Sequence, residues 1–274
     1  LPARLARHFS REIEARDSSK PSAGLATARN TTTPVAADFS LVQSDPGTRS
    51  RTSDRSEAEG LADGRYRKLE LLGRGTLGPT WQAEHLALGR RVVLKDIRSP
   101  FELVGQQDRA EILSRTRAAL LAQAEACHQN VVAIFDARLD SDRPYVVSEL
   151  ANGGNLRRRM REHADGVLPS AVASRMLLQV CHALASAHAR GSFHLALTPE
   201  NVLFDAWGNT KVSDFGLAAA VERGGDEHRA IVVGASAVAY LAPERIQSTG
   251  DRTSSPMADI YSLGIVAYEA LTGK

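Results

Sequence analysis

The sequence has few cysteines, little net charge and no long apolar run, and each absence narrows the class of protein. Cys127 and Cys181 stand far apart, without a Cys or His cluster at metal-ligand spacing, which favours a reduced interior over a disulfide framework. A net charge of +2 argues against nucleic acid or an acidic membrane as the main partner. No run of about 18 apolar residues appears, so we expect no membrane segment in this range. These absences predict a cytoplasmic protein.

Large apolar residues are also scarce in Leu1–Asp63, a segment rich in Ser, Thr, Ala, Arg and Pro. Such a segment cannot bury enough surface to offset its ordering entropy, so we predict a disordered tail. Within it, Leu1–Arg16 has apolar residues on one face of a helix, and both a docking helix and a frayed, solvated helix remain open. Thr48–Ser56 is either a phosphorylation target or plain linker. No basic-then-apolar leader is present, so no signal peptide is expected.

From Tyr66 the pattern changes to β-like runs, two of them flanking a glycine-rich turn and a third ending at Lys95. Gly73, Gly75 and Gly78 fit G-x-G-x-x-G, in which missing side chains let backbone N–H groups approach phosphates. Alone this motif is weak. The V-V-L-K run that ends at Lys95 raises its value, because it adds a cation close to a predicted phosphate cradle.

A second informative stretch is HLALTPEN, His194–Asn201, followed by SDFG at Ser213–Gly216. It resembles the protein-kinase catalytic loop H-R-D-x-x-x-x-N with its later D-F-G, and the glycine motif and Lys95 resemble the Gly-rich loop and V-A-I-K of the same family. The resemblance implies an α+β, two-lobed protein-kinase-like fold. We expect a small β-rich N-lobe over residues 64–149 and a larger helical C-lobe over residues 150–274. We refer below to His194–Asn201 as the catalytic loop.

The resemblance also implies a site for ATP and Mg²⁺. In the family the strand Lys, here Lys95, pairs with the α and β phosphates, and the Asn and Asp matched by Asn201 and Asp214 hold the metal ions. The alternative is that Asn201 and Asp214 are present because they hydrogen-bond the loop. The nucleotide-binding residues implied by the resemblance are Gly73, Gly75, Gly78, Lys95, Glu149, Ala151, Asn201, Leu203 and Asp214, with Asn201 and Asp214 also as metal ligands.

Several residues of the predicted adenine pocket depart from the family pattern. Thr80 stands where the family places Val, and Val93 replaces a small Ala in the roof of the pocket. Pro79 removes an amide hydrogen from the glycine-rich turn and fixes its φ. Ser148 occupies the gatekeeper position, where a small residue leaves the back of the pocket open; it is equally well explained as a satisfied serine at a strand end. We expect a tighter, more polar pocket and a lower ATP affinity.

The residues that position a substrate hydroxyl in the family are replaced as a set. Leu195 matches the Arg, Ala196 the catalytic Asp and Thr198 the Lys of the catalytic loop. Counting back from the A-P-E match at Ala242–Glu244, Ala237 matches the Thr that supports the base. The proton-transfer side is therefore predicted to be lost, with no catalytic residue assigned.

The helix predicted at Ala110–Ala126 lacks the acid that pairs with the strand Lys in kinases. Counting back from HQNVV, that position falls near Ala119, whereas Glu111 is too early and Glu125 too late. Without this partner, Lys95 is predicted to have no fixed geometry in the nucleotide-free state.

The C-terminal half is predicted to be helical. The arginine-rich run Leu156–Arg161 is interpreted as a solvated face. His182 and His188 lack the spacing that puts two metal ligands on one helical face, so they are assigned to core or surface roles. By resemblance, Asp259 hydrogen-bonds the backbone of the catalytic loop, and residues such as Leu271 face the core.

The resemblance covers about Tyr66–Lys274 and ends inside the large lobe, so we expect a fragment or a C-lobe completed from elsewhere. The hypothesis that fits these features is a pseudokinase, a nucleotide-binding module that regulates or scaffolds a protein partner. General-base catalysis contributes typically ~10²–10⁴ in rate, which leaves two alternatives open. One is an active or slow Ser/Thr kinase that uses another base, and the other is a structural remnant that binds no nucleotide.

Overall fold

The computed structural model describes residues 61–75, 77–97, 106–141, 143–163, 165–221, 237–247 and 255–274. The predicted tail lies outside these residues except at its end, and so do the predictions for Leu1–Arg16 and Thr48–Ser56. Strand β1, Leu61–Ala62, pairs antiparallel with strand β2, and Asp63 accepts a 2.8 Å hydrogen bond from the hydroxyl of Tyr145. These contacts join residues 61–63, the last residues of the predicted tail, to the sheet.

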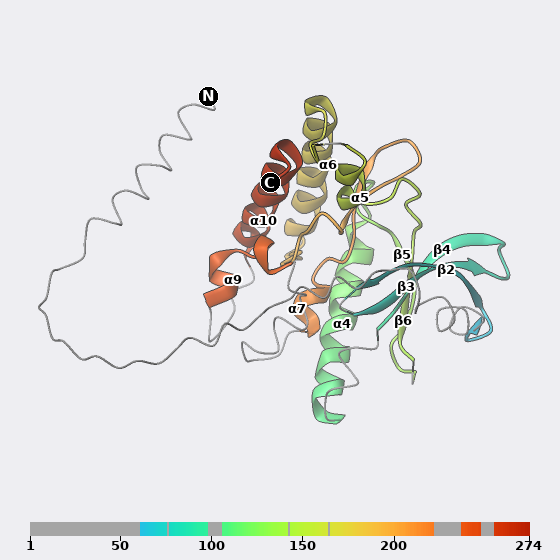
Figure 1. The fold of residues 1–274 in the computed structure, drawn as a ribbon. Coiled ribbons are helices and arrows are strands. Elements are labelled where there is room, and N and C mark those ends of the chain that lie inside the picture. Colours follow the sequence, from blue (N-terminus) through green and yellow to red (C-terminus); the bar gives the residue numbers. More distant parts are fainter. Residues whose placement is uncertain are drawn as a thin grey trace, which may run out of the picture. The chain divides into compact units, whose positions relative to one another are not determined.

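An antiparallel sheet of six strands forms the N-terminal lobe of the described residues, in the order β1-β2-β3-β4-β6-β5 (Figure 1). Alternation along β4 buries Val92 and Leu94 on one face and places Lys95 on the other. Lys95 pairs with Val146 of β6, whose side chain packs in the cluster shared with helix α4. The strands are β2 Tyr66–Gly75, β3 Gly78–His85, β4 Arg90–Asp96, β5 Ile134–Arg138 and β6 Tyr145–Ser148.

Helix α4, Gln106–Ala126, is rich in Ala, Leu, Gln and Arg, which have high helix propensity. Its apolar residues Ile112 and Leu120 pack against Ile97 and Val146 of the sheet. Lys95 thus lies on the face of the sheet that α4 covers. This is the position that the predicted site requires.

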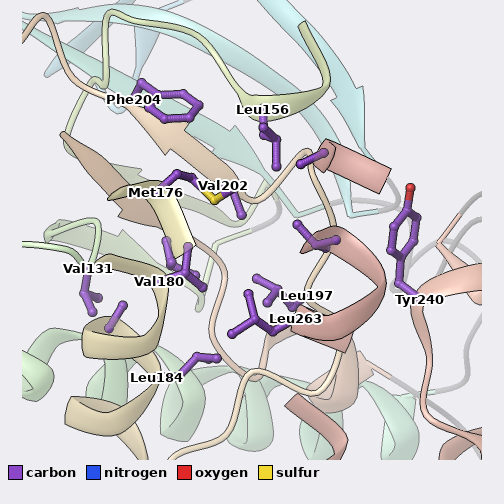
Figure 2. Packing of buried hydrophobic residues seen from close by; sticks show 14 of the residues in the cluster. Val131, Leu156, Met176, Val180, Leu184, Leu197, Val202, Phe204, Tyr240 and Leu263 are labelled. Carbon is purple, nitrogen blue, oxygen red and sulfur yellow. The ribbon is translucent and has the colours of Figure 1, made fainter. Parts of the chain in front are cut away.

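The C-terminal lobe is built on helices α6 and α10, which pack on each other. Buried residues recur every three or four positions along α6, as expected for an amphipathic helix. The first turn of α10 is capped by the Ser255 hydroxyl, which accepts a 3.2 Å hydrogen bond from the Met257 N–H. Figure 2 shows Leu197 of the catalytic loop beside Leu263 of α10 in the shared core. The elements are α5 Leu156–Arg161, α6 Ser170–His188, β7 Val202–Phe204, β8 Thr210–Val212, α7 Leu217–Val221, η1 Val238–Tyr240, α9 Pro243–Gln247 and α10 Pro256–Thr272.

The two-lobed α+β architecture expected from the resemblance is confirmed. Leu271 was predicted to face the core but is 44% exposed, because the α10 face that meets α6 carries Leu263, Val266 and Ala270 instead. Within the described part of the chain, no helix is both long and apolar enough to span a bilayer.

Candidate functional site

Asp259 of α10 anchors the backbone of the catalytic loop. This carboxylate is fully buried, and it accepts hydrogen bonds from the backbone N–H groups of His194 at 2.8 Å and Leu195 at 2.6 Å. The same carboxylate contacts Nε2 of His188 at 2.8 Å. The role predicted for Asp259 is therefore confirmed, and His188 serves the same anchor. Leu195 has a φ of 64°, a left-handed conformation that these bonds hold in place.

His194 joins the catalytic loop to the segment before D-F-G. Its Nε2 lies 2.9 Å from the Ser213 carbonyl oxygen, and its Nδ1 lies 3.4 Å from the Ala196 N–H. These contacts fit a neutral imidazole that donates from Nε2 and accepts at Nδ1. Burial lowers the pKa of His194 below its ordinary value, since the charged form would be desolvated.

Lys95 and Asn201, two of the predicted site residues, both contact the carboxylate of the third, Asp214. The ammonium of Lys95 lies 2.6 Å and 2.5 Å from its two oxygens, and the Asn201 amide donates to Oδ2 at 3.2 Å. The Thr198 hydroxyl donates to Oδ1 of Asn201 at 2.8 Å. Burial opposes ionisation of Asp214, but the charge of Lys95 outweighs it and keeps the pKa of this carboxyl below its usual value.

The donor set around Asp214 fits Mg²⁺ and a phosphate. Mg²⁺ prefers carboxylate and amide oxygens, which Asp214 and Asn201 carry. The ammonium of Lys95 suits a phosphate oxygen. The structure thus brings together Lys95, Asn201 and Asp214, as the spacing in the sequence predicts.

The glycine-rich turn has open space where side chains are missing. A Cβ added at Gly73 would meet no atom within 4 Å, and one at Gly75 would meet only the Gly78 carbonyl oxygen at 3.9 Å. Packing within the described residues therefore does not require glycine at either position, which is compatible with a ligand approaching the backbone. Gly78 has a φ of 145°, a conformation that L side chains rarely adopt.

Leu77, inside the same turn, points into the protein. Its side chain is only 6% exposed and belongs to the apolar cluster that includes Leu120 of α4 and Leu217, which follows D-F-G. Ala119 packs against this cluster from α4. The sequence analysis missed this contact, because a single Leu between glycines carries no periodic signal.

The remaining predicted nucleotide contacts lie near the junction of the lobes. The Glu149 side chain is held by Lys211, at 2.9 Å from one carboxylate oxygen and 3.0 Å from the other. Lys211 is the strand partner of Leu203 in the β7–β8 pair. Leu203 and Ala151 are both partly exposed. Adenine contacts of Glu149, Ala151 and Leu203 stay predictions.

The residues at the proton-transfer positions differ in their surroundings. Leu195, at the position of the family Arg, is buried in an apolar cluster with Ala242 and Ala258. Ala196, at the position of the catalytic Asp, is also buried. Thr198 is engaged with Asn201, and Ala237 is the residue directly before η1. Apolar packing thus occupies the position where the family places a cation.

Among the described side chains of helix α4, no acid pairs with Lys95. A Cβ added at Gly216 would lie 3.4 Å from the Cβ of Ala119, so Ala119 faces the D-F-G segment. Glu111 is instead an exposed partner of Arg115, one turn along the same helix. The expectation that Lys95 has no fixed geometry was wrong, because the carboxylate of Asp214 holds its ammonium in place.

Arg157 is a residue whose role the sequence analysis got wrong. The run Leu156–Arg161 was interpreted as a solvated face, yet Arg157 donates to Glu200 at 2.9 Å, to Glu269 and to the Tyr240 hydroxyl. Burial lowers the pKa of Arg157, but hydrogen bonds to Glu269 and Glu200 outweigh it and raise the pKa. Glu200, the carboxylate of the catalytic loop, is therefore paired.

A metal site made of His, Cys, Asp and Glu alone is not found in the described parts of the chain, where no three of these residues gather. His182 and His188 both lie on helix α6, and His188 contacts the carboxylate of Asp259.

The chain is similar to known proteins over the region that contains this site. The sequence model described as the protein kinase domain matches residues 66–274. The serine/threonine-protein kinase PknA of Mycobacterium tuberculosis (strain ATCC 25618 / H37Rv) is 35% identical over 216 residues, 77% of this chain and 47% of PknA. Pkn1 of Myxococcus xanthus is 36% identical over 78% of this chain and 30% of Pkn1. PrkC of Bacillus subtilis is 34% identical over 77% of this chain and 31% of PrkC. The chain spans about half the length of these relatives or less.

Proposed function

The chain belongs to the protein kinase family, and from that premise we propose that it is a pseudokinase that binds Mg²⁺ and ATP and regulates a protein partner. The observation that carries the proposal is the contrast within one site. Lys95, Asn201 and Asp214 meet around one carboxylate, while Ala196 stands at the catalytic Asp position beside buried Leu195. Binding of nucleotide is kept and phosphate transfer is lost.

The proposed loss of transfer rests on the carboxylates near Ala196. A methyl group cannot accept the proton of a substrate hydroxyl. Among the described residues of the neighbouring segments, the carboxylates of Glu200 and Asp214 are engaged by Arg157 and Lys95 respectively. Neither is available as a substitute base without breaking an ion pair.

The proposed nucleotide site rests on charge and open space. When bound, Mg²⁺ would bridge the phosphates and neutralise part of their charge. Asp214 and Asn201 would supply its protein ligands, and Lys95 would turn from Asp214 toward a phosphate. The turn containing Gly73 and Gly75 has room for a ligand to approach its backbone. A ligand that favours one arrangement of the lobes shifts the population of a partner-binding surface without turnover.

An active or slow Ser/Thr kinase is the second candidate. The printed names of PknA, Pkn1 and PrkC are those of serine/threonine-protein kinases, and the metal and phosphate residues match the family without change. A structural remnant is the third candidate. It draws support from the direct pairing of Lys95 with Asp214, since Lys95 must leave this partner to meet a phosphate.

Thermal unfolding of the complete protein with ATP, with and without Mg²⁺, tests the proposal alongside transfer of radiolabelled phosphate to itself and to a generic protein substrate. The pseudokinase predicts stabilisation by ATP that increases with Mg²⁺, and no labelling. Absence of stabilisation would favour the remnant. Labelling that disappears in Asp214→Ala would establish the kinase instead.

A further inference from the structure

Gln123 of α4 is a buried polar residue that the proposed site has not yet used. It lies four residues after Ala119, on the same face of the helix, and is only 3% exposed. Its Oε1 accepts a 3.1 Å hydrogen bond from the N–H of Phe215, and its Nε2 donates a 2.9 Å hydrogen bond to the carbonyl of Val132. Both ends of the amide are therefore satisfied by backbone groups outside α4.

The contact with Phe215 lies at the turn that orients Asp214. Asp214 has a φ of 66°, which is strained for a residue with a side chain. The next two N–H groups, of Gly216 and Leu217, make longer hydrogen bonds of 3.3 Å, to His194 and Asp214. Since Phe215 is buried, its N–H has no access to water and depends on Gln123.

The contact with Val132 links α4 to strand β8. The Val132 N–H donates to the Val212 carbonyl at 2.9 Å, and Val212 ends strand β8 two residues before Asp214. Gln123 thus connects α4 directly to Phe215 within D-F-G and, through Val132, to Val212 just before D-F-G. A neutral amide supplies both the donor and the acceptor that these two backbone groups need.

We propose that Gln123 is a positioning residue that takes the place of the missing helix acid. It ties α4 to the D-F-G segment through Phe215 and holds Asp214 in the geometry that meets Lys95 and Asn201. The part of the inference that concerns Mg²⁺ rests on the proposed function. The part that concerns the geometry of Asp214 does not.

Amide hydrogen exchange of the nucleotide-free, complete protein tests the tether directly. Gln123→Leu removes both hydrogen bonds at similar volume and is expected to speed exchange of the Phe215 amide on the order of tenfold, relative to a core amide of α10 such as Val266. Gln123→Glu keeps an acceptor for Phe215 but loses the donor to Val132, so a smaller increase is expected. Leu121→Ala, at an exposed position of the same helix, is the matched control.

Equal acceleration of the Phe215 and Val266 amides in Gln123→Leu would reduce Gln123 to a general core residue and overturn the proposal. If Gln123→Leu fails to fold, the same comparison in Gln123→Glu decides: preferential acceleration at Phe215 supports the tether, and its absence refutes it.

The second measurement is ATP affinity by calorimetry with and without Mg²⁺. Gln123→Leu is expected to reduce the gain in affinity from Mg²⁺ by about tenfold and to leave the affinity without Mg²⁺ close to wild type, because Asp214 acts through the metal. Equal loss with and without Mg²⁺ would argue against a positioning role. A wild-type protein without any Mg²⁺ effect would refute the proposed function, while the Phe215 exchange would still decide on Gln123.

Discussion

Asn201 and Leu195 lie in the same loop, six residues apart, yet their surroundings have opposite chemistry. Asn201 bonds Thr198 and Asp214 in a polar network that includes the charge of Lys95. Leu195 packs with Ala242 in an apolar cluster, at a position where the family carries a cation. The comparison teaches that one loop has two different surroundings, since apolar packing encloses Leu195 while hydrogen bonds and a charge surround Asn201. The metal side keeps its polar geometry.

The two regions share one support, Asp259, and removing it should have the largest effect. Asp259→Ala leaves the buried N–H groups of His194 and Leu195 without their acceptor, so we expect the free energy of unfolding to fall by about 3 kcal/mol or more. Urea denaturation measures it. Met257→Ala, at an exposed position of the same helix, is the control and should change stability by less than about 0.5 kcal/mol. A similar free energy of unfolding for the two variants would show that the catalytic loop does not depend on Asp259.

The metal side alone is tested by Asp214→Ala. Loss of the carboxylate removes the proposed metal ligand and should lower ATP affinity in Mg²⁺ by about ten- to hundredfold, or about 1.4–2.8 kcal/mol, with a smaller change without Mg²⁺. Calorimetry measures both affinities. Asp205→Ala, at a carboxylate of the β7–β8 turn, is the control. An unchanged ATP affinity in Mg²⁺ would show that Asp214 does not contribute to the nucleotide site.

Restoring a carboxylate to the other region sharpens the contrast. Ala196→Asp buries a charge beside Leu195 and is expected to cost about 1–2 kcal/mol of stability. Phosphate transfer should not appear, since Thr198 and Ala237 cannot hold the carboxylate as the family residues do. Ala196→Asn, with similar volume and no charge, separates the electrostatic from the steric cost. Efficient labelling by Ala196→Asp would mean that the region lacks only its base.

The smallest expected effect comes from His194, which touches both regions. Because burial lowers its pKa below 6.5, the unfolded chain takes up a proton first as the pH falls. The stability from neutral His194 is therefore complete above pH 6.5 and is lost below it, by at most about 1.4 kcal/mol per pH unit. Denaturation at pH 7.5 and 5.5 should show a weaker pH dependence in His194→Gln than in wild type. Equal pH dependence would assign the effect to other groups.

The sequence predicted what depends on spacing. Strand and helix positions and the anchoring bonds of Asp259 follow from motifs whose residues lie at fixed intervals. The pairing of Lys95 with Asp214 and the contact of Ala119 with the D-F-G segment were found only in the structure, because both depend on how the sheet and α4 pack on the catalytic loop.

The sequence did not predict which of several similar side chains is buried, because tertiary packing decides this. Among the arginines of α5, the orientation of the helix decides that Arg157 meets Glu200 and Glu269. Leu271 has the hydrophobicity of a core residue but lies outside the α10 face that meets α6. Gln123 gave no signal because a polar residue in an Ala-rich helix is normally read as exposed.

The burial of Leu195 also limits how the chain can change by mutation. An Arg at this position would bring a charge into the cluster of Ala242 and Ala258 before any acid or phosphate was there to meet it. A carboxylate at position 196, introduced first, would lack that cation. Whichever substitution comes first passes through a less stable protein, so the family's Arg and Asp can enter this loop at low cost only together. The burial of Leu195 thus makes single substitutions at positions 195 and 196 destabilising, in whichever order they occur.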